Sequence, residues 1–107
     1  MNNLINKLTG CGTALVTPFS DGQIDWEAWE RLLESQKAVD FLVPLGTTAE
    51  TPCLTDEEKS TLLKVAVAHA EGRPVIAGAG TNSLTGTLAN IDLLAPCNPD
   101  ALLVVVP

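Results

Sequence analysis

Short apolar runs alternate along the chain with stretches in which apolar residues recur at helical spacing. The runs at residues 11–17, 40–45, 74–78 and 101–106 predict strands, and Pro44 is expected to end or disturb the second. Helices are expected between the strands: Asp25 can cap the first, and Thr55-Asp56-Glu57-Glu58 fits the capping box that opens the second. The apolar stripes of the three helices are Trp26, Trp29, Leu32 and Leu33, then Leu62, Leu63, Ala66 and Ala70, then Leu84, Leu88, Ile91 and Ala95.

This alternation predicts an α/β fold with a parallel sheet, because strands that alternate with helices build βαβ units. The run at 101–106 is apolar at every position, which suits a strand buried on both faces. Such units form either an open doubly wound sheet or a (β/α)8 barrel. Because a full barrel takes about 250 residues, residues 1–107 would supply the N-terminal half of one barrel domain, about the first four strands and three helices.

The net negative charge of the chain limits which binding partners are expected. Thirteen acidic against six basic residues give a formal net charge of -7, and an acidic surface repels phosphate backbones and anionic lipids. We therefore expect no nucleic-acid and no membrane partner; no apolar run approaches the ~18 residues of a membrane span, and residues 1–10 lack the apolar core of a signal peptide. Cys11, Cys53 and Cys97 are far apart, so we expect buried free thiols in a reducing cytoplasm and no metal site.

Candidate chemistry is expected at the carboxyl ends of the strands, where α/β folds bind ligands. Gly46-Thr47-Thr48 follows the second strand; its glycine allows close backbone approach, and its hydroxyls and amides can hold a small carboxylate. An ordinary turn before a helix explains the same residues. Residues 78–83 resemble a dinucleotide fingerprint, G-x-G-x-x-S, but the acid about 20 positions on, Asp100, precedes the fourth strand instead of ending it, which disfavours dinucleotide binding.

The histidine and the four lysines of the chain indicate no second site. His69, the only histidine, lies within the second predicted helix, where a structural role is expected. A lysine used for amine chemistry needs a desolvated pocket. Lys7, Lys37, Lys59 and Lys64 fall in the N-terminal arm or on helices and are expected on the solvated surface.

Three strand-end segments, taken in order, are similar to the dihydrodipicolinate synthase family, which includes N-acetylneuraminate lyase. They are Gly12-Thr13-Ala14-Leu15-Val16-Thr17-Pro18-Phe19, Gly46-Thr47-Thr48-Ala49-Glu50 and Ala77-Gly78-Ala79-Gly80-Thr81-Asn82. The resemblance runs from about residue 10 to residue 107 and implies the N-terminal part of a (β/α)8 barrel enzyme. It implies a cytoplasmic class I aldolase-type lyase, in which a lysine holds pyruvate as a Schiff base. The synthase condenses pyruvate with aspartate semialdehyde in lysine and diaminopimelate synthesis.

The resemblance also implies residue roles. By position, Thr47 is similar to the hydroxyl that relays protons between two tyrosines, a task that suits a group able to donate and accept without ionising. Thr48 is similar to the residue that holds the pyruvate carboxylate, and the Thr-Thr pair favours the synthase over the lyase, whose loop resembles Gly-Ser-Thr. The resemblance implies no cofactor; the expected partners are pyruvate, an aldehyde and further copies of the chain in a homo-oligomer.

Several positions differ from the family pattern. The Schiff-base lysine would lie beyond residue 107 and the chain has no tyrosine, so the chain alone is expected to be inactive. Ala49 replaces a usual glycine, at a cost of about 1–2 kcal/mol if that position needs a positive φ. Asn82 matches a ligand position of a lysine effector site, where Gly86 replaces an expected Glu. Two alternatives stay open: a family member that acts on another 2-oxo acid, and a non-catalytic half-barrel that self-associates.

Overall fold

The computed structural model describes residues 2–105 and begins with a short helix where the sequence pattern indicated only an N-terminal arm. This helix, α1 (Asn2–Lys7), precedes strand β1 (Gly12–Ala14). A small hairpin follows, in which β2 (Phe19–Ser20) pairs antiparallel with β3 (Gln23–Ile24). Asp21 and Gly22 form its turn with φ angles of 53° and 77°, and two-residue hairpin turns favour such left-handed residues because they match the twist of the strands.

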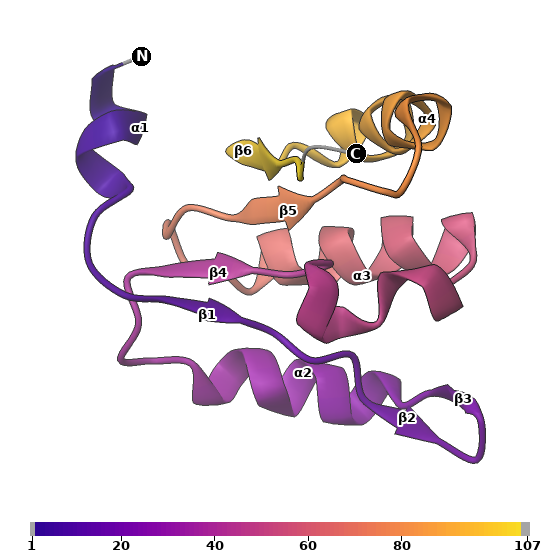
Figure 1. The fold of residues 1–107 in the computed structure, drawn as a ribbon. Coiled ribbons are helices and arrows are strands. Elements are labelled where there is room, and N and C mark those ends of the chain that lie inside the picture. Colours follow the sequence, from indigo (N-terminus) through magenta and orange to yellow (C-terminus); the bar gives the residue numbers. More distant parts are fainter. Residues whose placement is uncertain (1, 106–107) are drawn as a thin grey trace.

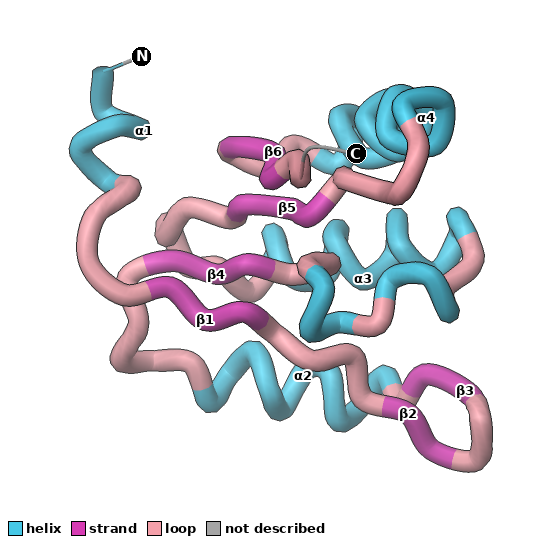
Figure 2. Tube along the Cα trace, in the orientation of Figure 1, coloured by secondary structure: helices cyan, strands magenta, loops and turns pink. Residues whose placement is uncertain are grey.

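The rest of the chain alternates helices and strands (Figure 1; Figure 2). In chain order the elements are α2 (Trp26–Ser35), β4 (Phe41–Val43), α3 (Asp56–Ala68), β5 (Ile76–Gly78), α4 (Leu84–Leu94) and β6 (Ala101–Leu103), with the short 3₁₀ helices η1 (Thr47–Ala49), η2 (Thr51–Cys53) and η3 (Ala95–Cys97) between them. Asp25 caps α2 by accepting from Ala28 N, and Thr55 with Glu58 forms a capping box on α3. Both predicted helix starts are confirmed.

Four strands lie side by side in the order β1-β4-β5-β6, all parallel. Strand β1 pairs with β4, and β5 pairs with β6. The two pairs join where Leu42 and Val75 form a parallel bridge and where Gly78 N donates to Pro44 O over 3.0 Å. Pro44 lies directly beyond the last residue of β4, as expected for a residue without an N–H to donate. The predicted alternation of helices with a parallel sheet is confirmed.

One face of the sheet packs against the helices. Leu42, Val75 and Ala77 lie on this face and are 0–1% exposed. Trp29 of α2 is 1% exposed, and its indole N–H donates to Leu62 O of α3 over 3.2 Å. Sheet and helices therefore enclose one hydrophobic core, which also contains Leu15, Leu33, Leu63, Ala66 and Leu94.

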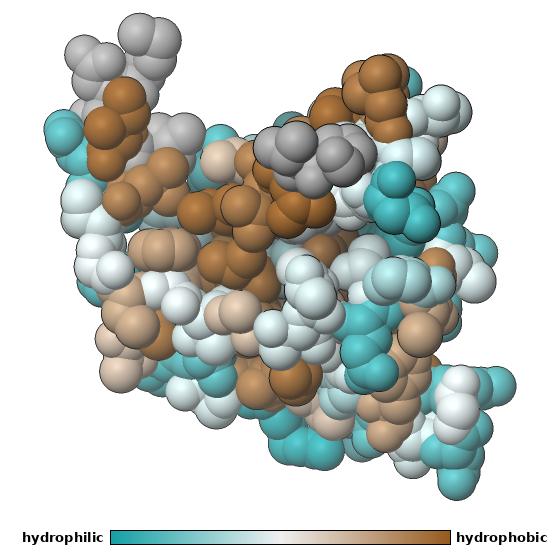
Figure 3. All heavy atoms as spheres, in the orientation of Figure 1, coloured by the Kyte–Doolittle hydropathy of each residue, from teal (hydrophilic) through white to brown (hydrophobic). Residues whose placement is uncertain are grey.

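The opposite face of the sheet is only partly covered by the described residues. The register aligns Ala14, Val43, Ile76 and Ala101 across the strands on this face. Ala14 is exposed and the other three are half-buried. Figure 3 shows hydrophobic residues gathered over the region of β4, β5 and β6. An apolar second face is what a strand needs if it is to be buried on both sides, as in a closed barrel.

The apolar stripe predicted for the third helix is wrong at three of its four positions, and only Ile91 packs against the core as expected. Leu84 and Leu88 of α4 are 66% and 53% exposed, and Ala95 is exposed too. The residues of α4 that are buried instead are Thr87, Asn90 and Leu94. The two polar residues can face the core because each hydrogen-bonds the backbone of the segment that follows β5.

The last predicted strand is shorter and more exposed than expected. Strand β6 ends at Leu103, and Leu103, Val104 and Val105 are 47%, 46% and 54% exposed. Burial on both faces needs a cover on the open side of the sheet, and the described residues cover that side only in part. The last two residues of the chain, Val106 at the end of the predicted run and Pro107, lie outside the described residues.

The cysteines are free thiols, as predicted, but their expected burial is wrong for two of the three. Cys97 is buried, whereas Cys11 and Cys53 are exposed. Cys11 precedes the edge strand β1, and Cys53 ends the surface helix η2, so neither reaches the core. Within residues 2–105, no helix is long and apolar enough to cross a membrane.

Candidate functional site

The loop after β4 carries Gly46-Thr47-Thr48, and the side-chain hydroxyl of Thr51 holds its backbone in place. Leu45, which is 3% exposed, adopts a left-handed conformation with a φ of 62° and turns the chain out of the strand; such a φ is uncommon for a residue other than glycine. Thr51 Oγ1 lies 3.0 Å from both Leu45 O and Gly46 O and can donate to either. Thr47 is therefore presented directly at the carboxyl edge of the sheet, as the first residue of η1.

Ala49 does not need the positive φ that a glycine would supply. It lies inside η1, is 1% exposed and is not among the left-handed residues of the chain. The left-handed residue that ends η1 is Glu50, with a φ of 57°. The cost of about 1–2 kcal/mol that a positive φ would impose on an alanine therefore does not arise at Ala49. Its methyl group is part of the packed interior of the loop.

Two glycines let the segment after β5 pass close to its neighbours. A Cβ atom on Gly78 would lie 2.0 Å from Leu45 O, and a Cβ atom on Gly80 would lie 2.8 Å from Val105 N. Both neighbours are backbone atoms, so a side chain at either position would push two chain segments apart. The segments that follow β4, β5 and β6 therefore meet at one edge of the sheet.

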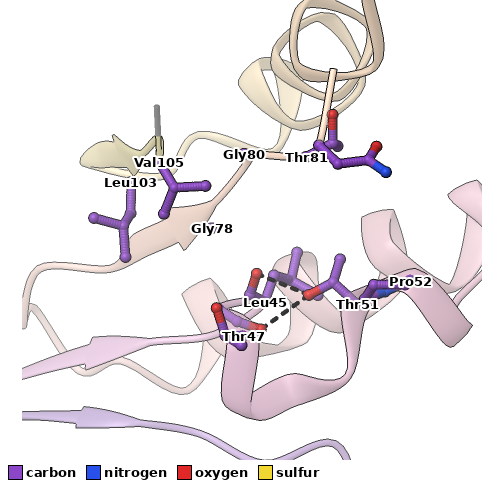
Figure 4. A pocket seen from close by; sticks show the side chains of 11 residues that line it. Leu45, Thr47, Thr51, Pro52, Gly78, Gly80, Thr81, Leu103 and Val105 are labelled. Carbon is purple, nitrogen blue, oxygen red and sulfur yellow. Dashed lines mark hydrogen bonds between the residues drawn. The ribbon is translucent and has the colours of Figure 1, made fainter. Parts of the chain in front are cut away.

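A cavity of about 450 Å³ opens where these three segments meet (Figure 4). Thr47 and Thr51 lie on one side of it, and Leu103 and Val105 lie on the other. The rest of its lining is Leu45, Gly46, Pro52, Gly78, Gly80, Thr81 and Asn82, and none of these described residues is charged. Thr48 is exposed and follows Thr47 in η1, but it is not part of the lining. The structure thus brings Thr47 and Asn82 to one cavity and leaves Thr48 beside it.

A second cavity, of about 340 Å³, shares a wall with the first. The shared residues are Thr51, Pro52, Gly80, Thr81 and Asn82. Lys59 and Asn90 line only the second cavity. The prediction that Lys59 is solvated is wrong: its side chain is 13% exposed, because α3 turns it toward α4, where its Nζ lies 3.3 Å from Asn90 Oδ1.

The remaining candidates have structural roles. His69 Nδ1 lies 2.9 Å from Val65 O at the end of α3, as expected for a structural histidine. The Asp100 carboxylate accepts from Val75 N over 2.8 Å at the amino ends of β5 and β6, away from the glycine loop at 78–83. This position agrees with the argument against dinucleotide binding. Within the described part of the chain, no group of three or more Cys, His, Asp or Glu side chains is placed to hold a metal ion.

The sequence matches the profile of the dihydrodipicolinate synthetase family over residues 7–107. The chain belongs to this family. The chain is similar to 4-hydroxy-tetrahydrodipicolinate synthases from several bacteria. It is 40% identical to the Thermosipho melanesiensis enzyme over 99 residues, 44% identical to that of Maridesulfovibrio salexigens over 101 residues, and 46% identical to that of Ruegeria pomeroyi over 101 residues. Each alignment covers 92% of this chain and 34–35% of the relative, so the chain spans about a third of the length of these relatives.

Solved structures of the family have the same fold. A monomeric dihydrodipicolinate synthase variant superposes with a TM-score of 0.88 at 39% identity, over 94% of this chain and 35% of that one. The Thermotoga maritima synthase gives 0.85 at 40% identity, over 92% and 34%. A 2-keto 3-deoxygluconate aldolase from Picrophilus torridus gives 0.83 at 25% identity, over 94% and 37%. The predicted fold class, the N-terminal part of a (β/α)8 barrel in a family of aldolase-type lyases, is confirmed.

Sequence reasoning missed three polar residues that line the two cavities: Thr51, Lys59 and Asn90. The contact of Lys59 with Asn90 joins positions 31 apart, and no local pattern reports such a contact. The burial of Asn90 could have been inferred from the sequence, because Thr87, Asn90 and Leu94 also recur at helical spacing. These three residues form the inner face of α4 in place of the predicted stripe.

Proposed function

We propose that this chain contributes the N-terminal part of the active site of a pyruvate-dependent class I lyase of the 4-hydroxy-tetrahydrodipicolinate synthase type. In this proposal, a lysine beyond residue 107 holds pyruvate as a Schiff base, and the Schiff base condenses with aspartate semialdehyde. The reaction serves lysine and diaminopimelate synthesis in the cytoplasm. The observation that carries the proposal is an uncharged cavity at the carboxyl edge of a parallel sheet, with Thr47 in its wall.

The composition of this cavity suits the proposed chemistry. A volume of about 450 Å³ accommodates a three-carbon acid together with a small aldehyde. Since the described lining has no charged side chain, the pyruvate carboxylate would be held by neutral donors, and Thr48 would supply a hydroxyl and an amide at the rim. Thr47 would pass a proton between neighbouring groups, because its hydroxyl donates and accepts without ionising.

Two alternatives each have an observation in their favour. The similarity to a 2-keto 3-deoxygluconate aldolase favours a sister activity, also of the neuraminate lyase kind, on another 2-oxo acid. The partly covered apolar face of the sheet favours a non-catalytic, self-associating half-barrel. A panel of aldehydes offered together with pyruvate separates the first alternative from the synthase.

A chimera tests the proposal. Residues 1–107 replace the matching N-terminal third of the Thermotoga maritima synthase, and condensation is followed with pyruvate and aspartate semialdehyde. Thr47→Val should lower kcat by about 100-fold or more, since only the proton path loses its hydroxyl. Thr48→Val should raise KM for pyruvate by about 5- to 150-fold, as expected when a carboxylate loses a charge-assisted bond of about 1–3 kcal/mol.

Borohydride trapping gives the control. Both variants should still form a pyruvate adduct that mass spectrometry detects, and Thr85→Val, at an exposed position of α4, should leave the kinetics unchanged. If the chimera forms the adduct and both Thr47→Val and Thr48→Val retain full turnover, the proposed roles are wrong.

A further inference from the structure

Within residues 2–105, the parallel sheet ends in two open edges. Strand β1 lies at one edge and β6 at the other, with β4 and β5 between them (Figure 1). Neither edge strand contains a charged residue. An edge of uncharged residues with unpaired backbone groups is a template for pairing with another strand. The chain therefore offers two such edges, and both belong to strands that run in the same direction.

The hydrogen bonds of the sheet show which backbone groups point to the open edge beside β6. Ala101 N donates to Val75 O over 3.3 Å, and Leu103 O accepts from Ala79 N over 2.9 Å. Ala101 and Leu103 therefore direct these groups at β5. Because the C=O and the N–H of one peptide plane point in opposite directions, the N–H of Val104 points to the open edge.

The same argument identifies an outward N–H group at the edge beside β1. Leu15 N donates to Val43 O over 3.0 Å, so the peptide plane between Ala14 and Leu15 points Ala14 O away from β4. Since the N–H and C=O groups of one residue in an extended strand point to the same side, Ala14 N–H also faces the open edge. Ala14 is exposed and Val104 is 46% exposed, so both groups are within reach of another chain.

Pairing of these two edges would enclose the apolar face of the sheet that the described residues cover only in part. Ala14, Val43, Ile76 and Ala101 lie across this face, and Leu103 continues it at 47% exposure. Figure 3 shows hydrophobic residues gathered over this region. A second copy related by a two-fold axis along the strands turns the same face toward the first and keeps every strand parallel. Two copies have eight strands, the number at which side chains just fill a barrel interior.

We propose that a polypeptide of residues 1–107 binds a second copy of itself, with β6 of each copy parallel to β1 of the other, and so forms a closed eight-stranded barrel. The β6–β1 contact occurs twice, as two-fold symmetry requires. The net charge of -7 on each copy opposes this association only weakly, because no charged residue lies in either edge strand and salt screens the charges elsewhere. The proposal does not rest on the lyase reaction proposed above.

The competing arrangement pairs β6 of one copy with β6 of the other. It leaves both β1 edges open and does not enclose the apolar face, so it covers less of the surface that favours association. The two arrangements make different demands on Ala14, whose N–H group takes part only in the closed barrel.

Sedimentation of the purified chain over a concentration series tests the closed dimer, because a barrel without free edges should not grow beyond two copies. Val104→Pro and Ala14→Pro each remove an outward N–H group without removing a hydrogen bond within the sheet, and proline is tolerated at such positions of an edge strand. Each should raise the dissociation constant of the dimer by about tenfold or more, since both β6–β1 contacts lose a bond. Val104→Thr keeps the N–H group and should change the constant by less than about threefold.

Hydrogen exchange on the unmodified chain supplies a readout that does not depend on the folding of a variant. The amides of Ala14 and Val104 should be protected only at concentrations at which the dimer forms, whereas the Leu15 amide, which donates within the sheet, should be protected at every concentration. A monomer, growth beyond the dimer, or free exchange of either outward amide in the dimer overturns the proposal. A dimer that Ala14→Pro leaves intact indicates β6–β6 pairing and also contradicts it. Turnover of the chimera tests the lyase proposal separately.

Discussion

Single residues hold the strand ends at both edges of the sheet. At the amino edge, Asp40 accepts from Cys11 N over 2.7 Å and Asp100 accepts from Val75 N over 2.8 Å. Each carboxylate thereby satisfies the N–H of a neighbouring strand just before pairing begins, and so fixes the register. At the carboxyl edge no such acid is needed, because Gly78 lets the backbones of two segments touch.

Replacing Gly78 by alanine should destabilise the chain by about 1–3 kcal/mol, the usual cost of overpacking. The added Cβ would lie 2.0 Å from Leu45 O, and the backbone there cannot rotate aside as a side chain could. Urea unfolding measures the loss. Gly46→Ala is the matched control, because a Cβ there meets nothing within 4 Å and its φ is −78°. Equal stability of the two variants would contradict the close approach of Gly78 to Leu45.

Among the elements, α3 connects the two cavities to the core. Its inner face buries Leu62, Leu63 and Ala66, and its first turns place Lys59 at the second cavity. The capping box fixes where this helix begins: Thr55 Oγ1 accepts from Glu58 N over 3.1 Å, and Glu58 Oε1 accepts from Thr55 N over 2.8 Å. A helix that began one residue later would rotate this face by about a quarter of a turn.

Removing the cap with Thr55→Ala should therefore lower the free energy of unfolding by about 1 kcal/mol. The expected cause is the unsatisfied Glu58 N–H in the first turn. Chemical denaturation followed by circular dichroism gives the value. Thr85→Ala, an exposed threonine in the first turn of α4, removes a hydroxyl without a cap and should change stability by less than about 0.5 kcal/mol. A cap variant as stable as this control would mean that Glu58 alone secures the helix start.

At the scale of the whole molecule, the main feature is an apolar sheet face that the described residues cover only in part, next to the edge strand β6. Ala14, Val43, Ile76 and Ala101 lie across this face. Segment 103–105 continues it and is 46–54% exposed. A strand edge of this composition is prone to pairing with another chain.

Residues 1–107 alone should accordingly sediment as a dimer or larger species. Self-association covers apolar surface that would otherwise face water. Ultracentrifugation over a concentration series measures the state. Leu103→Lys, at 47% exposure on this surface, should shift the equilibrium toward monomer, whereas Leu84→Lys, at 66% exposure on α4, should not. A monomer with cooperative melting at every concentration would show that the four strands suffice on their own.

The same chain should form no Schiff base with pyruvate. The first cavity has no lysine among its described lining residues. Of the lysines elsewhere, Lys59 is held by Asn90, and Lys37 pairs with Glu71 at 3.2 Å on the surface. Treatment with pyruvate and borohydride should leave the mass of the chain unchanged, while the chimera is labelled. A stoichiometric adduct on one lysine of the chain would refute this expectation.

Local patterns along the chain were sufficient to predict much of the fold. The helix starts at Asp25 and Thr55 and the strand end at Pro44 depend on interactions within a few residues, and the alternation of helices with strands follows from the local spacing of apolar residues; each is confirmed. The three strand-end segments led to the family, and Thr47 was expected at the site and lies in the wall of the first cavity.

Contacts between distant residues determined the rest. The inner face of α4 was misassigned because Thr87 and Asn90 are buried by hydrogen bonds to another segment, a gain that apolar spacing does not register. Lys59 was misassigned because only the packing of α3 against α4 places Asn90 beside it. The exposure of residues 103–105 was also missed, because it depends on which other segment packs against the open face of the sheet. Apolar spacing indicates which residues favour burial, but burial itself depends on the neighbour that tertiary packing brings to each face.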